Sequence, residues 1–459
     1  MESIVLAMGR KILPSSLYER LTTSSIAKRL ARGSLWSLFG SATARILVLV
    51  AMIVVARVLG QVSFGELGLI QSTLGMAGLM AGMGLGETAT RFVAKYATSD
   101  PLRAGRVIAL VTSVSIGTVL LATVVLISVS GAIAGAMLNA PHLQSALVWG
   151  SSLMAATAFR GIQGGVLAGL EKFDALAKLN ILDGVVSLIT MVFLARLMGV
   201  EGALLGLALG AIMVWVVGRV LLMKELNSRG IVVRYGGCGA DWRILTGFSL
   251  PSLMANLVVT PALWFAMTLV AQSEQGFAGL ALYNAAYQWH GPMVFLPMIL
   301  MWVSIPVLVQ EWEADRKKRF RSVTLWICGL TLALSLPPAV VAALFSPWIM
   351  SLYGPGFRQG WMVLVLLLAA APLNALAKIA SGALLGMNRA WWVVVINLGW
   401  SATVLAVTAW LVPTRGVLGL AIAYVAASAM LGTFSLASVL VGSKQRVAPE
   451  FVPDTTDHR

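Results

Sequence analysis

The sequence predicts an all-α polytopic membrane protein. We expect about twelve transmembrane helices in two six-helix lobes, related by a pseudo-two-fold axis along the membrane normal around a central cavity. Hydrophobic residues make up 59% of the 459 residues and charged residues only 11%, about half the charged fraction usual for a soluble protein. Apolar stretches long enough to cross a bilayer follow one another along the chain, and its two halves resemble each other.

The predicted spans are each about 20 residues long or longer, the length that an α-helix needs to cross a bilayer. They comprise residues 34–57, 65–86, 107–136, 146–169, 177–197, 202–223, 245–271, 279–308, 323–346, 361–386, 391–412 and 416–441. The polar segments between them predict five regions: a basic cytoplasmic N-terminal segment (1–33), an N-lobe (34–224), a cytoplasmic linker (225–243), a C-lobe (244–441) and a cytoplasmic tail (442–459).

The distribution of Lys and Arg predicts the orientation of the spans. The segments on the N-terminal side of the membrane hold 25 of these residues, and the loops on the other side hold four: Arg57, Arg196, Arg358 and Arg415. Cytoplasmic loops carry such an excess, so both termini are expected in the cytoplasm. The net charge of +15 therefore follows from topology and attraction to anionic lipid, and we expect no nucleic-acid partner.

An internal repeat predicts the two lobes. A shift of 217 residues places 165–214 on 382–431 without a gap, with ten identities that include glycines at 165, 169, 199 and 202. Six helices in each half give both halves the same orientation, which is the arrangement of a parallel repeat. Substrate sites in such transporters lie at the repeat interface, and transport proceeds as one half rocks against the other.

Three cations, Arg45, Arg160 and Lys378, lie near the middle of predicted spans. A cation at that depth costs several kcal/mol unless it faces a wet cavity or a partner. Arg45 lies about ten residues, or about 15 Å, from water, which exceeds the reach of its side chain. We therefore expect the three cations to line a cavity that binds an anionic substrate.

Polar neighbours accompany two of these cations. Gln163 follows Arg160 by one turn, and Asn374 precedes Lys378 by one turn, so each pair shares a helix side. We include Asn374 in the predicted substrate site.

Two acids are candidates for ion coupling. Asp183 is the only acid well within a predicted span, and it either neutralises Arg45 or Arg160 or carries H⁺ or Na⁺. Glu87, at the end of the second span, is the other candidate. Arg219, near the inner end of its span, is expected to have a structural role.

The eighth span opens with a polar and aromatic stripe. Asn284 and Gln288 share a helix face with Tyr287, and Trp289 and His290 follow directly. Such a stripe in an apolar helix favours a cavity lining, and aromatic rings with a donor can stack on sugar rings. The alternative is anchoring at the membrane interface. We predict substrate contacts for Asn284, Gln288, Trp289 and His290.

Proline is concentrated in the predicted spans seven to ten and absent from the interiors of spans one to six. Proline removes a backbone donor and kinks a helix. We therefore predict that the C-terminal half does most of the bending, with Pro261 as the leading hinge. The alternative is a purely structural role, because membrane helices tolerate proline.

Several segments together resemble the polysaccharide flippases, of the O-antigen type, within the multidrug/oligosaccharidyl-lipid/polysaccharide exporter superfamily. They are residues 33–38 (Gly-Ser-Leu-Trp-Ser-Leu), 56–60 (Ala-Arg-Val-Leu-Gly), 64–66 (Phe-Gly-Glu), 84–96 at the end of the second span, and the loop 352–357 (Leu-Tyr-Gly-Pro-Gly-Phe) leading into 364–366. The likeness covers about residues 30–441, and the ordered set of motifs carries it.

The resemblance implies translocation of an undecaprenyl-diphosphate-linked oligosaccharide across the bacterial plasma (inner) membrane, for O-antigen and lipopolysaccharide or for exopolysaccharide biosynthesis. Lipid II flippases of the superfamily carry a substrate-contacting arginine on their first helix, and Arg45 falls where that arginine is expected. Arg91, in the motif that ends the second span, would face the inner mouth. The implied partners are the lipid-linked oligosaccharide, the bilayer, and a polysaccharide polymerase or glycosyltransferases, with the protein acting as a monomer.

Two other functions fit the hydropathy pattern. A multidrug/cation antiporter would share the fold, but cationic substrates favour acidic cavity residues, and here the three cations outnumber the single acid Asp183. A membrane glycan polymerase or ligase carries large outer loops with catalytic residues, and the outer loops predicted here are short. The sequence has no Walker A motif, and its three histidines lack metal-ligand spacing. We therefore expect a transporter without enzymatic activity or cofactor.

Overall fold

The computed structural model describes residues 25–245, 249, 257–387 and 389–443. Within these ranges the chain forms helices and connecting turns, without a β-strand. The predicted N-terminal segment up to residue 24, the first part of the seventh span and the tail from residue 444 lie outside the described residues. Contacts between helices divide the chain into two units, one ending at Thr260 and the other beginning at Pro261.

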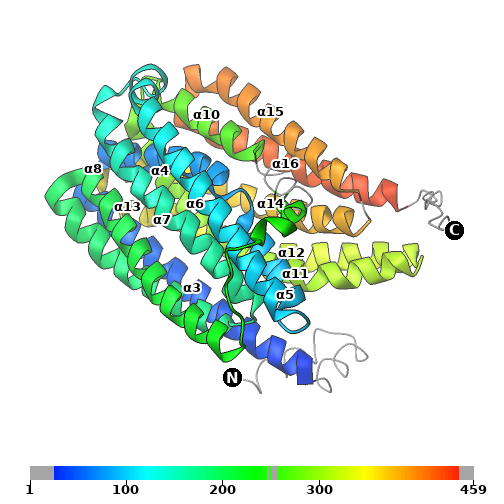
Figure 1. The fold of residues 1–459 in the computed structure, drawn as a ribbon. Coiled ribbons are helices and arrows are strands. Elements are labelled where there is room, and N and C mark those ends of the chain that lie inside the picture. The colour runs from blue at the N-terminus through cyan, green and yellow to red at the C-terminus, as the bar shows by residue number, and fades with distance from the viewer. Residues whose placement is uncertain (1–24, 246–248, 250–256, 388, 444–459) are drawn as a thin grey trace. The chain divides into compact units, whose positions relative to one another are not determined.

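The first unit is built around α7. Its helices are α3 (Ser25–Leu59), α4 (Gln61–Gly82), α5 (Leu85–Tyr96), α6 (Pro101–Ala132), α7 (Gln144–Gly169) and α8 (Phe173–Ser228), with the short turns η1 (Ile133–Met137), η2 (Pro141–Leu143) and η3 (Cys238–Asp241). Helix α7 packs against α4, α5, α6 and α8, and α8 also packs along α3 (Figure 1). The segment after α8, which includes Val232 and Asp241, lies against α6.

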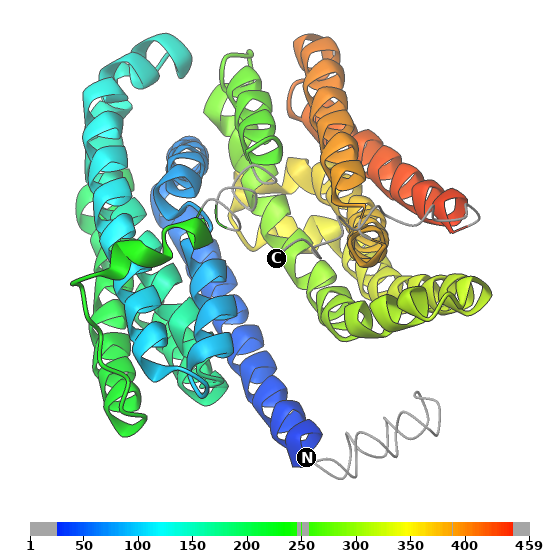
Figure 2. The ribbon, with the colours of Figure 1, turned by 45° about the vertical axis from the view of Figure 1, so that its right-hand side comes forward.

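The second unit is built in the same way around α14. Its helices are α10 (Val259–Ala271), α11 (Gly276–Glu313), α12 (Lys317–Leu344), α13 (Ser346–Ser351), η5 (Pro355–Gly360), α14 (Trp361–Gly386), α15 (Ala390–Arg415) and α16 (Val417–Gly442). Helix α14 contacts α11, α12, α15 and α16. Figure 2 shows the orange α15 packed against the red α16.

Helices occupy the predicted spans throughout the described residues, so the all-α polytopic fold is confirmed. By length and apolarity alone, seven of the described helices could cross a membrane, or eight if the bent pair α4–α5 counts as one span. The prediction of about twelve is larger because α8 contains two predicted spans. In addition, α7 and α11 are not among the seven, and α10 is short.

The backbone repeats as the sequence alignment predicts. Helices α7 and α14 both have 26 residues, and a shift of 217 places both of their ends, and the starts of α8 and α15, on each other. Gly199, inside α8, has φ 62° and ψ −133°, and its counterpart Gly416 has φ 55° and ψ −133°. Few residues other than glycine adopt this conformation. The two halves therefore turn between their last two helices at the same kind of glycine hinge.

The second predicted span is broken. The sequence predicts one helix over 65–86, whereas the chain bends by about 40° between α4 and α5. Met83 and Gly84, between the two helices, both have left-handed backbone conformations, with φ 42° and 65°. Beyond the bend, α5 approaches α7 so closely that a Cβ on Gly165 would overlap the Gly86 carbonyl and a Cβ on Gly86 would lie 2.9 Å from the Gly161 carbonyl oxygen. The bend therefore directs α5 onto α7.

The linker after α8 is held against α6. The Arg103 guanidinium donates to Asp241 from Nε (3.1 Å) and Nη2 (2.9 Å). A Cβ on Gly105 would overlap the carbonyl of Val232, so the linker backbone lies directly on the α6 surface at this glycine. The start of α6 is itself fixed by Asp100, whose side chain accepts from the Arg103 backbone N–H (2.9 Å).

Pro261, the predicted hinge, is the third residue of α10. In the first turn of a helix a proline costs no backbone hydrogen bond, because that N–H would be unpaired in any case. Pro337, Pro338 and Pro372 lie inside α12 and α14. The hinge role of Pro261 stays a prediction.

Candidate functional site

An ion pair lies between two apolar helices of the first unit. Arg160 on α7 lies with its Nη1 2.5 Å from Oδ1 of Asp183 on α8, and the two side chains are 33% and 18% exposed. This contact matches one of the alternatives left open by the sequence, in which Asp183 neutralises Arg160. Partial burial strengthens the attraction between the two charges.

Arg45 lies at the level of this pair. It is exposed on α3, and the residue after Asp183, Gly184, approaches α3 so closely that a Cβ would lie 2.9 Å from Cβ of Leu47 and 3.3 Å from Cα of Ala44. The α3–α8 contact therefore brings Asp183 to the depth of Arg45. Sequence reasoning placed these charges at similar depths but could not decide which helices meet.

Gln163 does not join Arg160. Its side-chain amide donates to the backbone carbonyl of Trp215 in the second half of α8 (3.1 Å), and the side chain is buried. Gln163 therefore joins α7 to α8 by a hydrogen bond and does not extend a polar side that begins at Arg160.

Arg91 and Glu87 both lie exposed on α5. The buried face of α5 is formed by other residues: Thr88 hydrogen-bonds the Ser249 hydroxyl (2.6 Å), and Thr90 donates to the carbonyls of Gly86 and Gly165. Arg91 and Glu87 therefore lie on the exposed face of α5, opposite the residues that pack against the rest of the unit. Their roles at the inner mouth and in ion coupling stay predictions.

A polar and aromatic cluster lies in the second unit. Nδ2 of Asn374 on α14 lies 3.3 Å from Nε2 of His290 on α11 and donates to the Ser428 hydroxyl on α16 at 3.0 Å. The His290 ring stacks on Tyr287, with 5.4 Å between the ring centres, and meets Tyr424 edge-on at 5.6 Å. The structure thus brings together two residues that the sequence singled out separately, His290 and Asn374.

Tyr424, Ser428 and Trp400 complete this cluster and were missed by sequence reasoning. Trp400 on α15 meets Tyr424 edge-on, with 5.8 Å between ring centres. The available signal was a tyrosine and a serine one turn apart in the otherwise apolar span 416–441. The spacing of Tyr424 and Ser428 alone fits a residue pair that lines a cavity and equally a pair that packs against another helix.

Two donors of the cluster, the Tyr283 hydroxyl and the Trp400 indole nitrogen, are buried without a hydrogen-bond partner in the described part of the chain. The Asn284 amide nitrogen, also on α11, is buried without one as well. The Tyr283 side chain is only 1% exposed and stacks on Tyr287. Aromatic faces with donors beside them suit the recognition of a sugar ring. Gln288 and Trp289 are both half-buried on α11.

Lys378 is exposed on α14, one turn after the buried Asn374. None of the ion pairs in the described residues involves Lys378. The second unit therefore presents one exposed cation close in sequence to a neutral polar cluster. Within the described ranges, no three His, Cys, Asp or Glu side chains are grouped as metal ligands.

The architecture is shared with solved transporters. A mutant of the MATE transporter VcmN from Vibrio cholerae is 17% identical, with a TM-score of 0.66, and the match covers 93% of this chain and 98% of that chain. A transporter of the MOP superfamily from Pyrococcus furiosus, described by the reversed polarity of its binding pocket, is 14% identical, with a TM-score of 0.69 and coverage of 91% and 96%. The fold is therefore that of a helical membrane transporter.

Within that class, the family is also clear. The model of the family described as "Polysaccharide biosynthesis protein" matches residues 30–312, more than half of the chain. This protein belongs to that family, as the motifs at 33–38 and 84–96 predict.

Shorter matches connect the chain to named relatives. It is 30% identical over 112 residues to the EPS I polysaccharide export inner membrane protein EpsE of Ralstonia nicotianae. This matched segment covers 24% of this chain and 26% of the relative. The protein of the same name from Ralstonia solanacearum is 29% identical over 111 residues, with the same coverage. The chain thus matches about a quarter of the length of these relatives.

Proposed function

We propose that this protein flips an undecaprenyl-diphosphate-linked oligosaccharide across the bacterial plasma (inner) membrane by alternating access, for surface or exopolysaccharide biosynthesis. The observation that carries the proposal is the placement of exposed cations on apolar helices, Arg45 on α3 and Lys378 on α14, in a chain of the polysaccharide biosynthesis family. The export relatives in Ralstonia, described as inner membrane proteins, support both the substrate class and the location.

The diphosphate is the part of this substrate that needs the cations. Moving two phosphate charges through an apolar region without compensation is far more costly than placing one Arg or Lys there. A guanidinium binds phosphate oxygens through two parallel hydrogen bonds, and an ammonium acts as a compact point charge. We assign the diphosphate to Arg45 and Lys378, and to Arg160 once its pairing with Asp183 is broken.

The glycan would contact the aromatic cluster. Tyr287, His290 and Tyr424 offer ring faces and edges, and the unpaired donors of Tyr283 and Asn284 can bond to sugar hydroxyls. We assign the predicted contacts of Gln288, Trp289 and Asn374 to the glycan as well. The lipid tail would stay in the bilayer.

The Arg160–Asp183 pair offers a route for coupling to H⁺. When Asp183 accepts a proton, its charge is lost and Arg160 is freed for the diphosphate. Release of the proton restores the pair and weakens the hold on the substrate. Na⁺ bound by Asp183 would act in the same way, so the coupling ion is H⁺ or Na⁺, with Glu87 as the second candidate.

The remaining proposals concern the setting of the protein. The excess of Lys and Arg in alternate loops places both termini in the cytoplasm. We propose a functional monomer that receives its substrate from glycosyltransferases and delivers it to a polysaccharide polymerase.

Complementation of a flippase-deficient strain with the matching glycan pathway tests this function. We expect the wild type to restore surface glycan, and Arg45→Ala and Lys378→Ala to lower it by at least about tenfold, since each removes a charge-assisted contact worth about 1.5–3 kcal/mol. Arg196→Ala, which removes an exposed arginine of α8 three residues before the turn at Gly199, is the matched control and should retain full function.

Full activity of both variants at equal protein levels would remove these cations as the diphosphate site. A wild type that fails to restore glycan but lowers accumulation of a cationic dye would instead support the multidrug antiporter. Transport that is lost in Asp183→Asn, with protein level and thermal stability unchanged, would support ion coupling at Asp183.

A further inference from the structure

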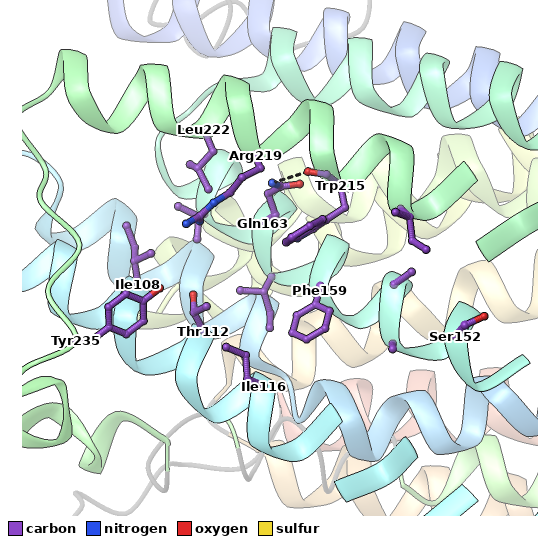
Figure 3. Close-up of a pocket in the computed structure, with 15 residues that line it drawn as sticks. Ile108, Thr112, Ile116, Ser152, Phe159, Gln163, Trp215, Arg219, Leu222 and Tyr235 are labelled. Atoms are coloured by element: carbon purple, nitrogen blue, oxygen red, sulfur yellow. Dashed lines mark hydrogen bonds between the residues drawn. The ribbon is translucent and has the colours of Figure 1, made fainter. Parts of the chain in front are cut away.

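The first unit has a cavity that lies apart from its predicted substrate residues. It has a volume of about 610 Å³ and is lined by α6, α7, the second half of α8 and the linker residue Tyr235. Figure 3 shows Arg219 and Tyr235 at one end and Ser152 at the other, with Phe159 and Trp215 between them. Neither Arg45, Arg160 nor Asp183 lines it.

The walls of this cavity are long and apolar. Along α7 the lining extends from Ser152 to Val166, about 21 Å at the rise of an α-helix and longer than the half-thickness of a bilayer core, about 15 Å. Ile116 and Ile212 on facing helices are 51% and 42% exposed, so the cavity is an open groove. A groove of this shape suits an extended hydrocarbon chain.

The polar group in the middle of the groove is already satisfied. Gln163 donates to the carbonyl of Trp215, the bond drawn as a dashed line in Figure 3. The middle of the groove therefore offers an apolar surface, and its polar chemistry is concentrated at the end formed by Arg219 and Tyr235.

Arg219 provides a charge that the surrounding residues do not compensate. It is half-buried, and none of the ion pairs or side-chain hydrogen bonds in the described part of the chain involves it. Two arginines of α6 near the linker differ from it in this respect, because Arg103 and Arg106 both lie by Asp241, at 2.9 and 3.7 Å. A cation at the end of an apolar groove in a membrane protein favours an anionic lipid headgroup.

The linker places Tyr235 at the same end of the cavity as Arg219 (Figure 3). The packing of Val232 on Gly105 fixes the linker on α6, three residues before Tyr235. The tyrosine is 52% exposed, so its hydroxyl is available to donate to a phosphate oxygen. The guanidinium and the hydroxyl together form a headgroup site that closes one end of the groove (Figure 3).

We propose that this groove binds one anionic glycerophospholipid, with its phosphate on Arg219 and Tyr235 and one acyl chain along Ile116, Phe159 and Ile212. The proposal does not depend on the flippase function, because the groove shares no residue with the proposed substrate site. A structural lipid here would fill the space between α6, α7 and α8 that protein side chains leave open.

Native mass spectrometry of the full-length protein in detergent tests the site. We expect retained dioleoylphosphatidylglycerol to exceed dioleoylphosphatidylethanolamine at equal concentration. Arg219→Gln should lower retained phosphatidylglycerol by about tenfold, the loss expected for one charge-assisted hydrogen-bond partner, and should remove the preference. Arg196→Gln, which removes one exposed arginine elsewhere in α8, should leave binding unchanged.

Two more variants keep the test decisive if Arg219→Gln does not fold. Tyr235→Phe changes an exposed linker residue and should lower retention of phosphatidylglycerol severalfold. Ala155→Phe, in the groove wall, should lower retention of both lipids with Arg219 intact.

Equal retention of phosphatidylglycerol by wild type, Arg219→Gln and Tyr235→Phe would overturn the proposal. So would a shift in melting temperature by inorganic phosphate alone that requires Arg219, because the site would then bind free phosphate. Displacement of phosphatidylglycerol by a polyprenyl diphosphate at lower concentration would assign the groove to the carrier lipid and would also overturn it.

Discussion

The two units have the same backbone plan and different polar interiors. Helices α7 and α14 occupy the same central place and end at corresponding glycines, and Gly199 and Gly416 make the same turn. The 217-residue shift places Asp183 on Trp400. The first unit therefore has an acid paired with Arg160 where the second has an indole packed on Tyr424.

A second difference between the units lies near the start and the end of α8. Lys172, just before α8, pairs with Glu225 at 2.8 Å, and Glu225 also pairs with Arg229 at 2.6 Å. The counterparts of Lys172 and Glu225 are Arg389 and Gly442, so the second unit has no acid at that position. The repeat therefore keeps the backbone turns while its side chains differ. At position 183 and its counterpart, the first unit therefore has a paired carboxylate and the second an aromatic ring.

Replacing Trp400 by Ala should give the largest effect on the second unit. Trp400 is 4% exposed, and truncating a buried aromatic side chain costs about 3–5 kcal/mol. Thermal unfolding in detergent should show a lower melting temperature than the wild type. Trp410→Ala, in the same helix but at a tryptophan that is 76% exposed, is the control and should have little effect. Equal melting temperatures for the two variants would remove Trp400 from the core of the cluster.

Replacing Asp183 by Leu should destabilise the first unit by about 2–3 kcal/mol, because it leaves Arg160 without its partner on an apolar helix. The double change Arg160→Leu with Asp183→Leu should recover most of that loss. Chemical or thermal unfolding of the single and double variants measures this. If the two single changes add in the double variant, the 2.5 Å contact contributes no coupling energy.

Substitution should destabilise both glycine turns, and Gly416 more than Gly199. A Cβ at Gly416 would overlap Oε1 of Gln275, whereas nothing lies within 4 Å of a Cβ at Gly199. Gly199→Ala and Gly416→Ala each force a side chain into a left-handed backbone, at a cost of about 1–2 kcal/mol per site. Gly117→Ala, inside α6 where open space surrounds the position that a Cβ would take, should stabilise by about 0.5–1 kcal/mol. Melting temperatures of the three variants test this, and an effect at only one of the two turns would break the comparison.

The ion pairs of Glu225 should matter least. We expect Glu225→Gln to cost about 1 kcal/mol or less, because Lys172 and Arg229 are 38% and 31% exposed and exposed pairs contribute little. The loss should shrink further at high salt. Unfolding measured at low and high salt checks both statements, and a larger cost at high salt would contradict the electrostatic explanation.

The sequence by itself determined the helical membrane fold and the repeat. These follow from local patterns: spans follow from runs of apolar residues, and the repeat from glycines whose backbone conformation few other residues can adopt. The sequence also offered the pairing of Asp183 with Arg160 as one of the possible roles of that acid.

Only the tertiary structure decided which side chains meet. It paired Arg160 with Asp183, turned Gln163 toward Trp215, broke the second span after Gly82, and gathered Tyr424 and Trp400 around His290. In an apolar helix, periodicity does not distinguish the face toward lipid from the face toward another helix, because both are apolar. The packing of helices distant in sequence makes that choice.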